Sequence, residues 1–330
     1  MARKALTGNL MRKAILISLS GLLLSACNPH KRTPAVVELK DAPTFNEDSA
    51  YRFIEDQVDF GFRIPGTESH EACGDYLVSK LAGYGFDVSE QKDTILGFDK
   101  QQFPLRNIIA SLNPNTEKRM LLCAHWDSRA FADQASENQE KPIVGANDNA
   151  SGVGVALEIA RLMGQNPPSI GIDIVLFDME DQGRPADQTD ADPNDHGYCL
   201  GSEYWCLNLD GPKQEFGILL DMVGATNAEF TLEGYSVEYA KEYTYMIWDL
   251  GNQLGYDNHF IYNRTHRVYD DHARVNYMAG IPCVDIIHQD VQNKMLFWDH
   301  WHTHNDNLDV IDKSTLKAVG QTVTQVVYNQ

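Results

Sequence analysis

Two neighbouring acids follow directly on a strand that the sequence marks as buried. The run Gly171 to Phe177 is mostly apolar and β-branched, and Glu180, Asp181 and Gly183 come soon after it. Such a strand belongs inside an α/β sheet, where ligand crevices form at the carboxyl ends of the strands. Adjacent strand residues point to opposite faces, so two such acids can take different roles where the chain leaves the sheet. One can hold a metal ion while the other moves a proton.

In a chain with 47 Asp and Glu, two solvated loop acids are the simpler interpretation. Other segments, however, end in the same way. A second apolar strand ends at His125 and a third at Asp221, while Asp148 lies in a glycine-bounded turn before a helix. Backbone in such a turn is free to approach a ligand. A single Asp at a helix start is usually a cap, but several strand ends that converge in one domain indicate a site.

Two further imidazoles, His302 and His304, lie in a loop before the last helix. Carboxylates combined with one or two imidazoles and no thiolate are typical of a catalytic zinc site, in which three protein ligands leave one position open. The sequence therefore predicts a zinc centre at the carboxyl edge of the sheet.

Helical and extended patterns alternate along the chain. We expect helices over residues 46–60, 69–82, 150–163, 201–209, 237–254, 271–278 and 313–328. Besides the strand described above, we expect strands over residues 86–90, 106–112, 120–125, 216–222, 230–233 and 283–287. The alternation predicts a three-layer α/β domain, with a mixed and mostly parallel sheet covered by helices on both faces.

The N-terminus is typical of a targeting segment. Two basic residues precede the apolar run Ala14 to Leu24, and Cys27 follows small residues. This layout resembles a bacterial lipoprotein signal, and the run is too short to span a bilayer as a helix. We expect a signal peptide over 1–26, a lipid anchor on Cys27, a tether over 27–44 and one catalytic domain over 45–330. The protein would then be anchored in the bacterial cell envelope, periplasmic or outer-membrane associated.

The charge of the chain excludes one class of partner. Without residues 1–26, 23 basic residues face 47 acidic ones, a formal charge of −24. A polyanion of this kind is not a nucleic-acid binder. The length and the absence of low-complexity segments suit one domain with a full core, and we expect a monomer.

The cysteines leave two interpretations open. Besides Cys27 the chain has Cys73, Cys123, Cys199, Cys206 and Cys283. Cys199 and Cys206 are near enough in sequence to pair, but their spacing fits neither a redox nor a zinc motif. Buried thiols explain them equally well.

An ordered series of motifs carries a family resemblance from about residue 45 to the C-terminus. The series is His125-Trp-Asp127, Asp148, Glu180-Asp181, Asp221, Asp270-Asp271-His272 before Gly280-Ile281-Pro282, and Trp301-His302-Thr303. It is similar to the zinc-aminopeptidase fold and, within that fold, resembles the animal-type glutaminyl-peptide cyclotransferases and their bacterial relatives.

The resemblance implies a ligand set and a proton carrier. Asp148, Asp181 and His302 fall where the cyclases hold a single zinc ion, and Glu180 falls on their proton-transferring glutamate. Asp181 departs from the family pattern because it replaces a glutamate that is one methylene longer.

The resemblance also implies substrate contacts. Asp221 falls on the aspartate that assists at the substrate nitrogen, and Asp270 on an aspartate that hydrogen-bonds behind it. Trp301 falls on a tryptophan that lines the pocket, and Trp298 belongs to the same aromatic segment. Asp285 stands where the animal enzymes have a histidine, and we expect it to contact substrate in its place.

The residue types suit ring closure of an N-terminal glutamine. The free α-amine attacks the side-chain amide of the same residue and releases ammonia. Zinc would polarise the γ-carbonyl, and Glu180 would carry a proton from the amine to the leaving nitrogen. The partners would be peptide and protein N-termini that carry glutamine.

A two-zinc aminopeptidase of the same fold is the main alternative. There, the positions of His125 and Asp221 hold a second metal and the position of Asp148 bridges both, and this chain keeps all three. The aromatic segment 297–301 and the Asp270-Asp271 pair favour the cyclase.

A non-catalytic binding lipoprotein that keeps an enzyme fold is a third alternative. Such a protein could lose Glu180 without penalty, so the intact glutamate counts against it.

Overall fold

The computed structural model describes residues 34–185, 197–290 and 297–330. Within these ranges, no helix combines the length and apolar character needed to cross a membrane. The expected signal peptide 1–26 and its Cys27 lie outside the described residues.

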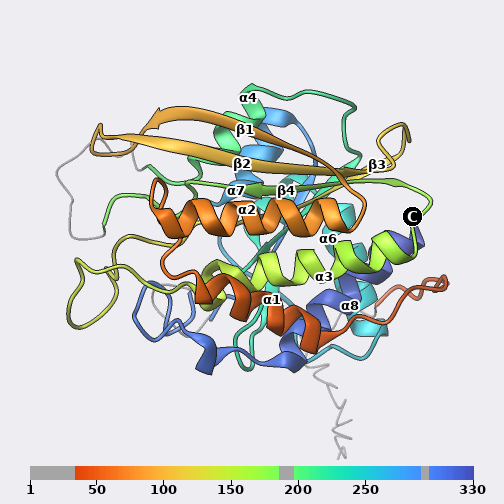
Figure 1. The fold of residues 1–330 in the computed structure, drawn as a ribbon. Coiled ribbons are helices and arrows are strands. Elements are labelled where there is room, and N and C mark those ends of the chain that lie inside the picture. The colour runs from red at the N-terminus through yellow and green to blue at the C-terminus, as the bar shows by residue number, and fades with distance from the viewer. Residues whose placement is uncertain (1–33, 186–196, 291–296) are drawn as a thin grey trace, which may run out of the picture. The chain divides into compact units, whose positions relative to one another are not determined.

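A mixed sheet of six strands forms the middle of the fold (Figure 1). In spatial order the strands are β1 (Asp87–Leu96), β2 (Gln102–Leu112), β4 (Gly171–Phe177), β3 (Arg119–His125), β5 (Phe216–Asp221) and β8 (Cys283–Ile287). The last four run parallel, whereas β2 pairs antiparallel with both β1 and β4. The carboxyl ends of the parallel strands therefore meet at one edge.

Helices cover both faces of the sheet. One face packs against α1 (Glu47–Asp59), α2 (Glu68–Gly83), α3 (Gly152–Gln165), α6 (Lys241–Gln253) and α8 (Lys313–Asn329). The other face packs against α4 (Leu200–Leu207) and the π-helical turn η2 (Val275–Ala279). Leu121 and Leu122 are successive residues of β3 and enter opposite cores, as strand alternation requires. The predicted three-layer α/β fold is confirmed.

Some elements differ from the sequence prediction. The segment 237–254 is split at Ala240, whose backbone leaves the helical region, into α5 (Gly234–Tyr239) and α6. The expected helix over 271–278 is a short α7 (Asp271–Arg274) followed by η2. A strand that the sequence analysis did not predict, β7 (Phe260–Arg264), pairs with β6 (Phe230–Leu232). It is short and only partly buried, and its last two residues are polar and exposed, so it shows no clear alternation of apolar and polar residues.

Part of the expected tether is bound to the domain. The side chain of Gln253 on α6 pairs with both the N–H and the C=O of Val37, at 3.0 and 2.9 Å. On α8, Gln325 donates to the Lys40 carbonyl, and Gln321 accepts from Phe45 N at 2.8 Å. Residues 37–45 thus lie along two helices through side-chain amides, rather than forming a free linker.

We predict that replacing Gln253 and Gln325 together with alanine will release this segment. The double variant loses three hydrogen bonds to the segment. Each is worth about 1 kcal/mol, so the open state should become roughly a hundredfold more populated. Cleavage between residues 34 and 45 by a broad-specificity protease should accelerate accordingly. Gln101→Ala, in the exposed loop between β1 and β2, is the matched control. Equal cleavage rates in all variants would contradict the role of the amides.

Candidate active site

A cavity of about 610 Å³ opens at the carboxyl edge of the parallel strands. Its lining in the described chain is Asp148, Glu180, Asp181, Tyr198, Asp221, Met222, Arg267, Val268, Tyr269, Asp270, Ile287, Phe297, Trp301 and His302. One part of the wall is therefore acidic and another is apolar or aromatic. The strand ends that the sequence singles out do converge.

Asp148, Asp181 and His302 form a group whose potential ligand atoms all lie within 4.8 Å of one another. His302 Nε2 is 3.1 Å from Asp181 Oδ1 and 3.8 Å from Asp148 Oδ2. All three side chains are buried. Their convergence from three separate loops is the arrangement that a metal centre requires.

A second group shares one member with the first. The Nε2 atom of His125 lies 3.0 Å from Asp148 Oδ1 and 3.4 Å from Asp221 Oδ1, and these three residues also offer ligand atoms within 4.8 Å of one another. Asp148 therefore faces an imidazole with each of its oxygens. The donor geometry alone accommodates a single metal or a pair.

The hydrogen bonding of the potential ligand residues also fits a metal ion. Asp181 Oδ2 is buried and accepts no hydrogen bond within the described chain. His302 Nδ1 lies 3.0 Å from Asp133 Oδ1, which directs the other ring nitrogen toward the two acids. Imidazole oriented by a carboxylate, with hard carboxylate co-ligands, is a zinc-type donor set.

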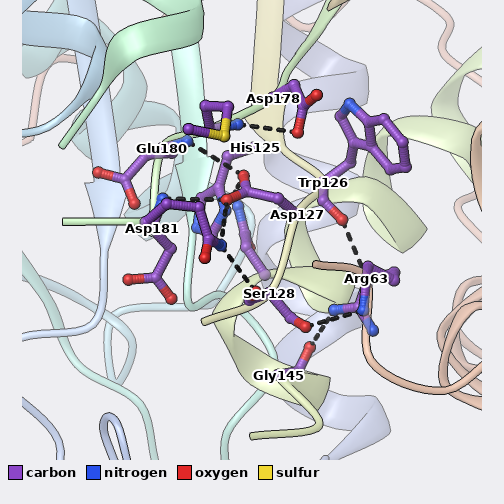
Figure 2. Close-up of polar contacts among 12 residues, drawn as sticks. Arg63, His125, Trp126, Asp127, Ser128, Gly145, Asp178, Glu180 and Asp181 are labelled. Atoms are coloured by element: carbon purple, nitrogen blue, oxygen red, sulfur yellow. Dashed lines mark hydrogen bonds and ion pairs between the residues drawn. The ribbon is translucent and has the colours of Figure 1, made fainter. Parts of the chain in front are cut away.

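Asp127 positions the neighbouring acids Glu180 and Asp181. Its carboxylate accepts hydrogen bonds from the backbone N–H groups of Glu180 and Asp181, both at 3.1 Å, and from Gln182 Nε2 at 2.9 Å (Figure 2). One residue in the segment just after β3 thereby fixes the loop after β4. The sequence motif includes Asp127 but gives it no role.

Arg63 is a fully buried cation that sequence reasoning missed. Its guanidinium donates to the carbonyls of Trp126, Val144 and Gly145, at 3.0, 2.9 and 2.7 Å (Figure 2). These carbonyls belong to the loop after β3 and to the turn before Asp148. Arg63 therefore ties together the two loops that carry acids of the site, and no local pattern in the sequence signals this.

Asp306 holds the backbone of a ligand residue. Its carboxylate accepts from Asn147 N at 2.7 Å and from Asp148 N at 3.0 Å. It follows His302 closely in sequence, so the last loop both supplies one ligand and positions another. This proximity to His302 is the only sequence signal that could have identified it.

Arg129 and Asp133 contact two of the potential metal ligands, Asp181 and His302. Arg129 donates to Asp133 through two nitrogens, at 2.8 and 3.0 Å, and lies 3.3 Å from Asp181 Oδ1. Asp133 in turn contacts His302. A buried guanidinium beside a cluster of acids reduces their mutual repulsion.

Glu180 has a different environment from Asp181. It is 9% exposed, and Cys199 Sγ lies 3.2 Å from its Oε1. Burial raises the pKa of Glu180 well above its usual value, and the Asp270 and Asp181 carboxylates raise it further, against the opposing effect of His125. A carboxyl with a raised pKa inside a cavity is suited to carrying a proton.

Asp221 and Asp270 line the cavity next to Glu180. Burial and the Asp270 carboxylate raise the pKa of Asp221 to about 8. Trp301 lines the wall and stacks on the ring of His302, with centroids 3.7 Å apart. These residues lie where a substrate in the cavity would touch them.

Two residues expected to contact substrate lie elsewhere. Asp285 is fully buried on β8, 3.4 Å from His272 Nδ1, and is not part of the cavity lining. Trp298 lines a separate hollow with His288 and His300. Asp285 is inside the sheet layer, and the ring of Trp298 turns toward His300 rather than toward His302. The geometry gives neither residue a direct contact with a ligand of this cavity.

His304 does not belong to the metal group, and the described cysteines form no disulfide. His304 is exposed, and its Nε2 lies 3.2 Å from the carbonyl oxygen of Asn138, so it does not join His302. The five described cysteines are buried free thiols, and Cys199 and Cys206 do not pair.

Residues 107–327 match the sequence profile of peptidase family M28. The chain belongs to this family. The glutaminyl cyclase of Bacteroides thetaiotaomicron, solved with bound N-acetylhistamine, is 46% identical, with a TM-score of 0.85 over 88% of this chain and 100% of that one. A Zn-dependent exopeptidase from Parabacteroides distasonis is 45% identical, with a TM-score of 0.86 over the same shares.

A more distant relative extends the comparison beyond bacteria. The glutaminyl-peptide cyclotransferase of Gloydius blomhoffii is 25% identical over 289 residues, which cover 77% of this chain and 73% of that protein. The chain is therefore similar in sequence to both bacterial and animal cyclases over most of its length.

We predict that Asp306→Ala will weaken binding of Zn²⁺, used as the probe, roughly 10- to 100-fold, the usual cost of losing a residue that orients a ligand. The change leaves two buried N–H groups without an acceptor, so the turn that carries Asp148 should loosen. Competition with a coloured chelator measures the affinity. Asp309→Ala, an exposed acid in the 3₁₀ helix η3 (Leu308–Val310) that follows, is the control. Unchanged affinity in Asp306→Ala would exclude this positioning role.

Proposed function

We propose that this chain is a zinc-dependent glutaminyl cyclase that converts the N-terminal glutamine of peptides and proteins to pyroglutamate. The similarity to a solved bacterial glutaminyl cyclase over nearly the whole chain carries the proposal. The site supports it, because a buried glutamate lies beside a three-residue metal group in the wall of one cavity.

We assign one zinc ion per chain to Asp148, Asp181 and His302. Bound there, it would polarise the γ-carbonyl of the substrate and stabilise the negative charge that develops on its oxygen. The backbone contacts of Asp127 and Asp306 hold two of the ligand loops for this task.

Glu180 moves the proton. It accepts one from the α-amine as the new C–N bond forms, and gives it to the amide nitrogen as the old C–N bond breaks and ammonia leaves. Burial and neighbouring acids raise its pKa, so both proton transfers are feasible near neutral pH.

Asp221 and Asp270 accept hydrogen bonds from the substrate amine and orient it toward the carbonyl carbon. Trp301, Phe297 and Ile287 form the apolar wall, against which the aliphatic part of glutamine folds back. Because the reaction is intramolecular, holding this folded conformer is the main contribution of the wall.

A two-zinc aminopeptidase is the second candidate, because Asp148 is shared between two potential ligand groups. A non-catalytic binding protein is less well supported, since the cavity is open to a ligand and keeps Glu180 in its wall.

We further propose that the chain is a monomer anchored through lipid on Cys27 in the bacterial cell envelope, periplasmic or outer-membrane associated. The order of basic, apolar and small residues before Cys27 supports this location. There it would act on exported peptides that begin with glutamine.

Metal content measured beside two activities separates the two enzymes. We expect one zinc ion per chain, pyroglutamate and ammonia from a glutaminyl peptide, and no leucine from leucyl amide. Two zinc ions with release of leucine and without pyroglutamate would reverse the assignment.

We predict that Glu180→Gln will retain zinc but lower kcat by roughly 10²- to 10⁴-fold, the usual contribution of general acid–base catalysis. Ammonia release gives kcat, and elemental analysis gives the metal content. Glu203→Gln, a partly exposed glutamate paired with Arg274, should leave both unchanged. Full activity in Glu180→Gln would remove this residue from the mechanism.

A further inference from the structure

Arg267 stands out in the cavity wall because it is the only Lys or Arg among the described lining residues. It begins the segment 267–270, whose other end is Asp270. The Arg267 side chain is 57% exposed, whereas Asp270 is 3% exposed. The segment therefore runs from the rim of the cavity to its interior, with the guanidinium at the rim.

The backbone around Arg267 is fixed on both sides. Gly234 N donates to the His266 carbonyl at 3.2 Å, and Val268 N donates to Glu233 Oε1 at 2.8 Å. Gly234 is required here, because a Cβ on it would come within 2.7 Å of the Arg267 backbone nitrogen. The guanidinium is thus presented from rigid backbone rather than from a mobile loop.

Two side chains of α5 keep the guanidinium in place. It lies 5.2 Å from the ring centroid of Tyr235 and forms an ion pair with Glu238. Glu238 is itself partly exposed and is not among the lining residues of the cavity. A second carboxylate that approaches from the cavity can therefore share the cation, since a guanidinium has donors on more than one edge.

Acidic residues dominate the interior of the cavity. They are Asp148, Glu180, Asp181, Asp221 and Asp270. Their oxygens can accept hydrogen bonds from the free amine of a substrate, but they offer no favourable partner to a carboxylate on the residue that follows it. Among the described lining residues, Arg267 is the only Lys or Arg that can pair with such a carboxylate. Its Cα is at most about 10 Å along the chain from that of Asp270, so the long arginine side chain is within reach of a second substrate residue.

We propose that Arg267 is a specificity-determining residue that favours substrates with a carboxylate directly after the N-terminal glutamine. The inference rests on the proposed cyclase activity and adds a substrate class to it. The carboxylate is supplied by Asp or Glu at the second position, or by the free C-terminus of a glutaminyl dipeptide. A basic second residue is disfavoured at the same place, and such repulsion contributes to specificity.

The test compares kcat/KM for three tripeptide amides, Gln-Glu-Ala, Gln-Gln-Ala and Gln-Lys-Ala. A further pair, Gln-Ala with a free or an amidated C-terminus, distinguishes the two sources of the carboxylate. The full chain is measured as wild type, R267Q, R267E and E238Q. R52Q is the matched control, because Arg52 also pairs with a glutamate but lies on α1 outside the cavity lining.

We expect wild type to prefer the Glu peptide over the Lys peptide. R267Q should reduce that ratio roughly fivefold, the scale of one exposed ion pair, and R267E should invert it. E238Q should raise the ratio, because it frees the cation for substrate. The neutral Gln-Gln-Ala amide should change little, and R52Q should match wild type.

An equal fall for all three peptides in R267Q would mean that Arg267 only anchors the segment, and it would overturn the inference. So would an unchanged ratio in both R267Q and E238Q. These results leave the cyclase assignment intact. If wild type cyclises none of the glutaminyl peptides, the proposed function fails and this inference fails with it.

Discussion

The structure depends on keeping several carboxylates close together inside one cavity. Two like charges 4 Å apart repel by about 4 kcal/mol at an effective dielectric constant of 20. Asp148 is stabilised by an imidazole on each of its oxygens, and Asp181 by His302 and Arg129. Asp221 has less compensation, and its pKa rises to about 8. Such a cluster favours whatever brings positive charge to it, whether a divalent ion, a proton or a substrate amine.

The ligand loops are held mainly through their backbone groups. Arg63 binds backbone carbonyls rather than acids, and Asp127 and Asp306 accept from backbone N–H groups. Each of these contacts joins loops that are distant in sequence. The loops are therefore positioned before any metal binds, which lowers the ordering cost of binding.

The sequence was sufficient to predict most helices and strands and their layers, because these depend on the periodicity of apolar residues. Parallel strands place their carboxyl ends at one edge, so the convergence of Asp148, Asp181 and His302 could be expected from strand ends together with the family resemblance. Arg63 could not be, because its partners are backbone carbonyls 63 to 82 residues away and leave no local pattern. Asp285 was placed by analogy with a histidine. The sequence predicted its strand, but only the fold shows that its side chain is fully buried and is not part of the cavity lining.

The neighbouring acids Glu180 and Asp181 lie in one loop but have different chemical roles. Both backbone N–H groups bind the same Asp127 carboxylate, yet the side chains have different neighbours. Burial raises the pKa of each, but Asp181 has His302 and Arg129 beside it, and these favour its ionised form. Glu180 is buried beside the Asp270 carboxyl, and both burial and that carboxyl favour its protonated form. A ligand must stay ionised and a proton carrier must change its state. Glu180 and Asp181 therefore have different roles because their side chains contact different residues in the loop after β4.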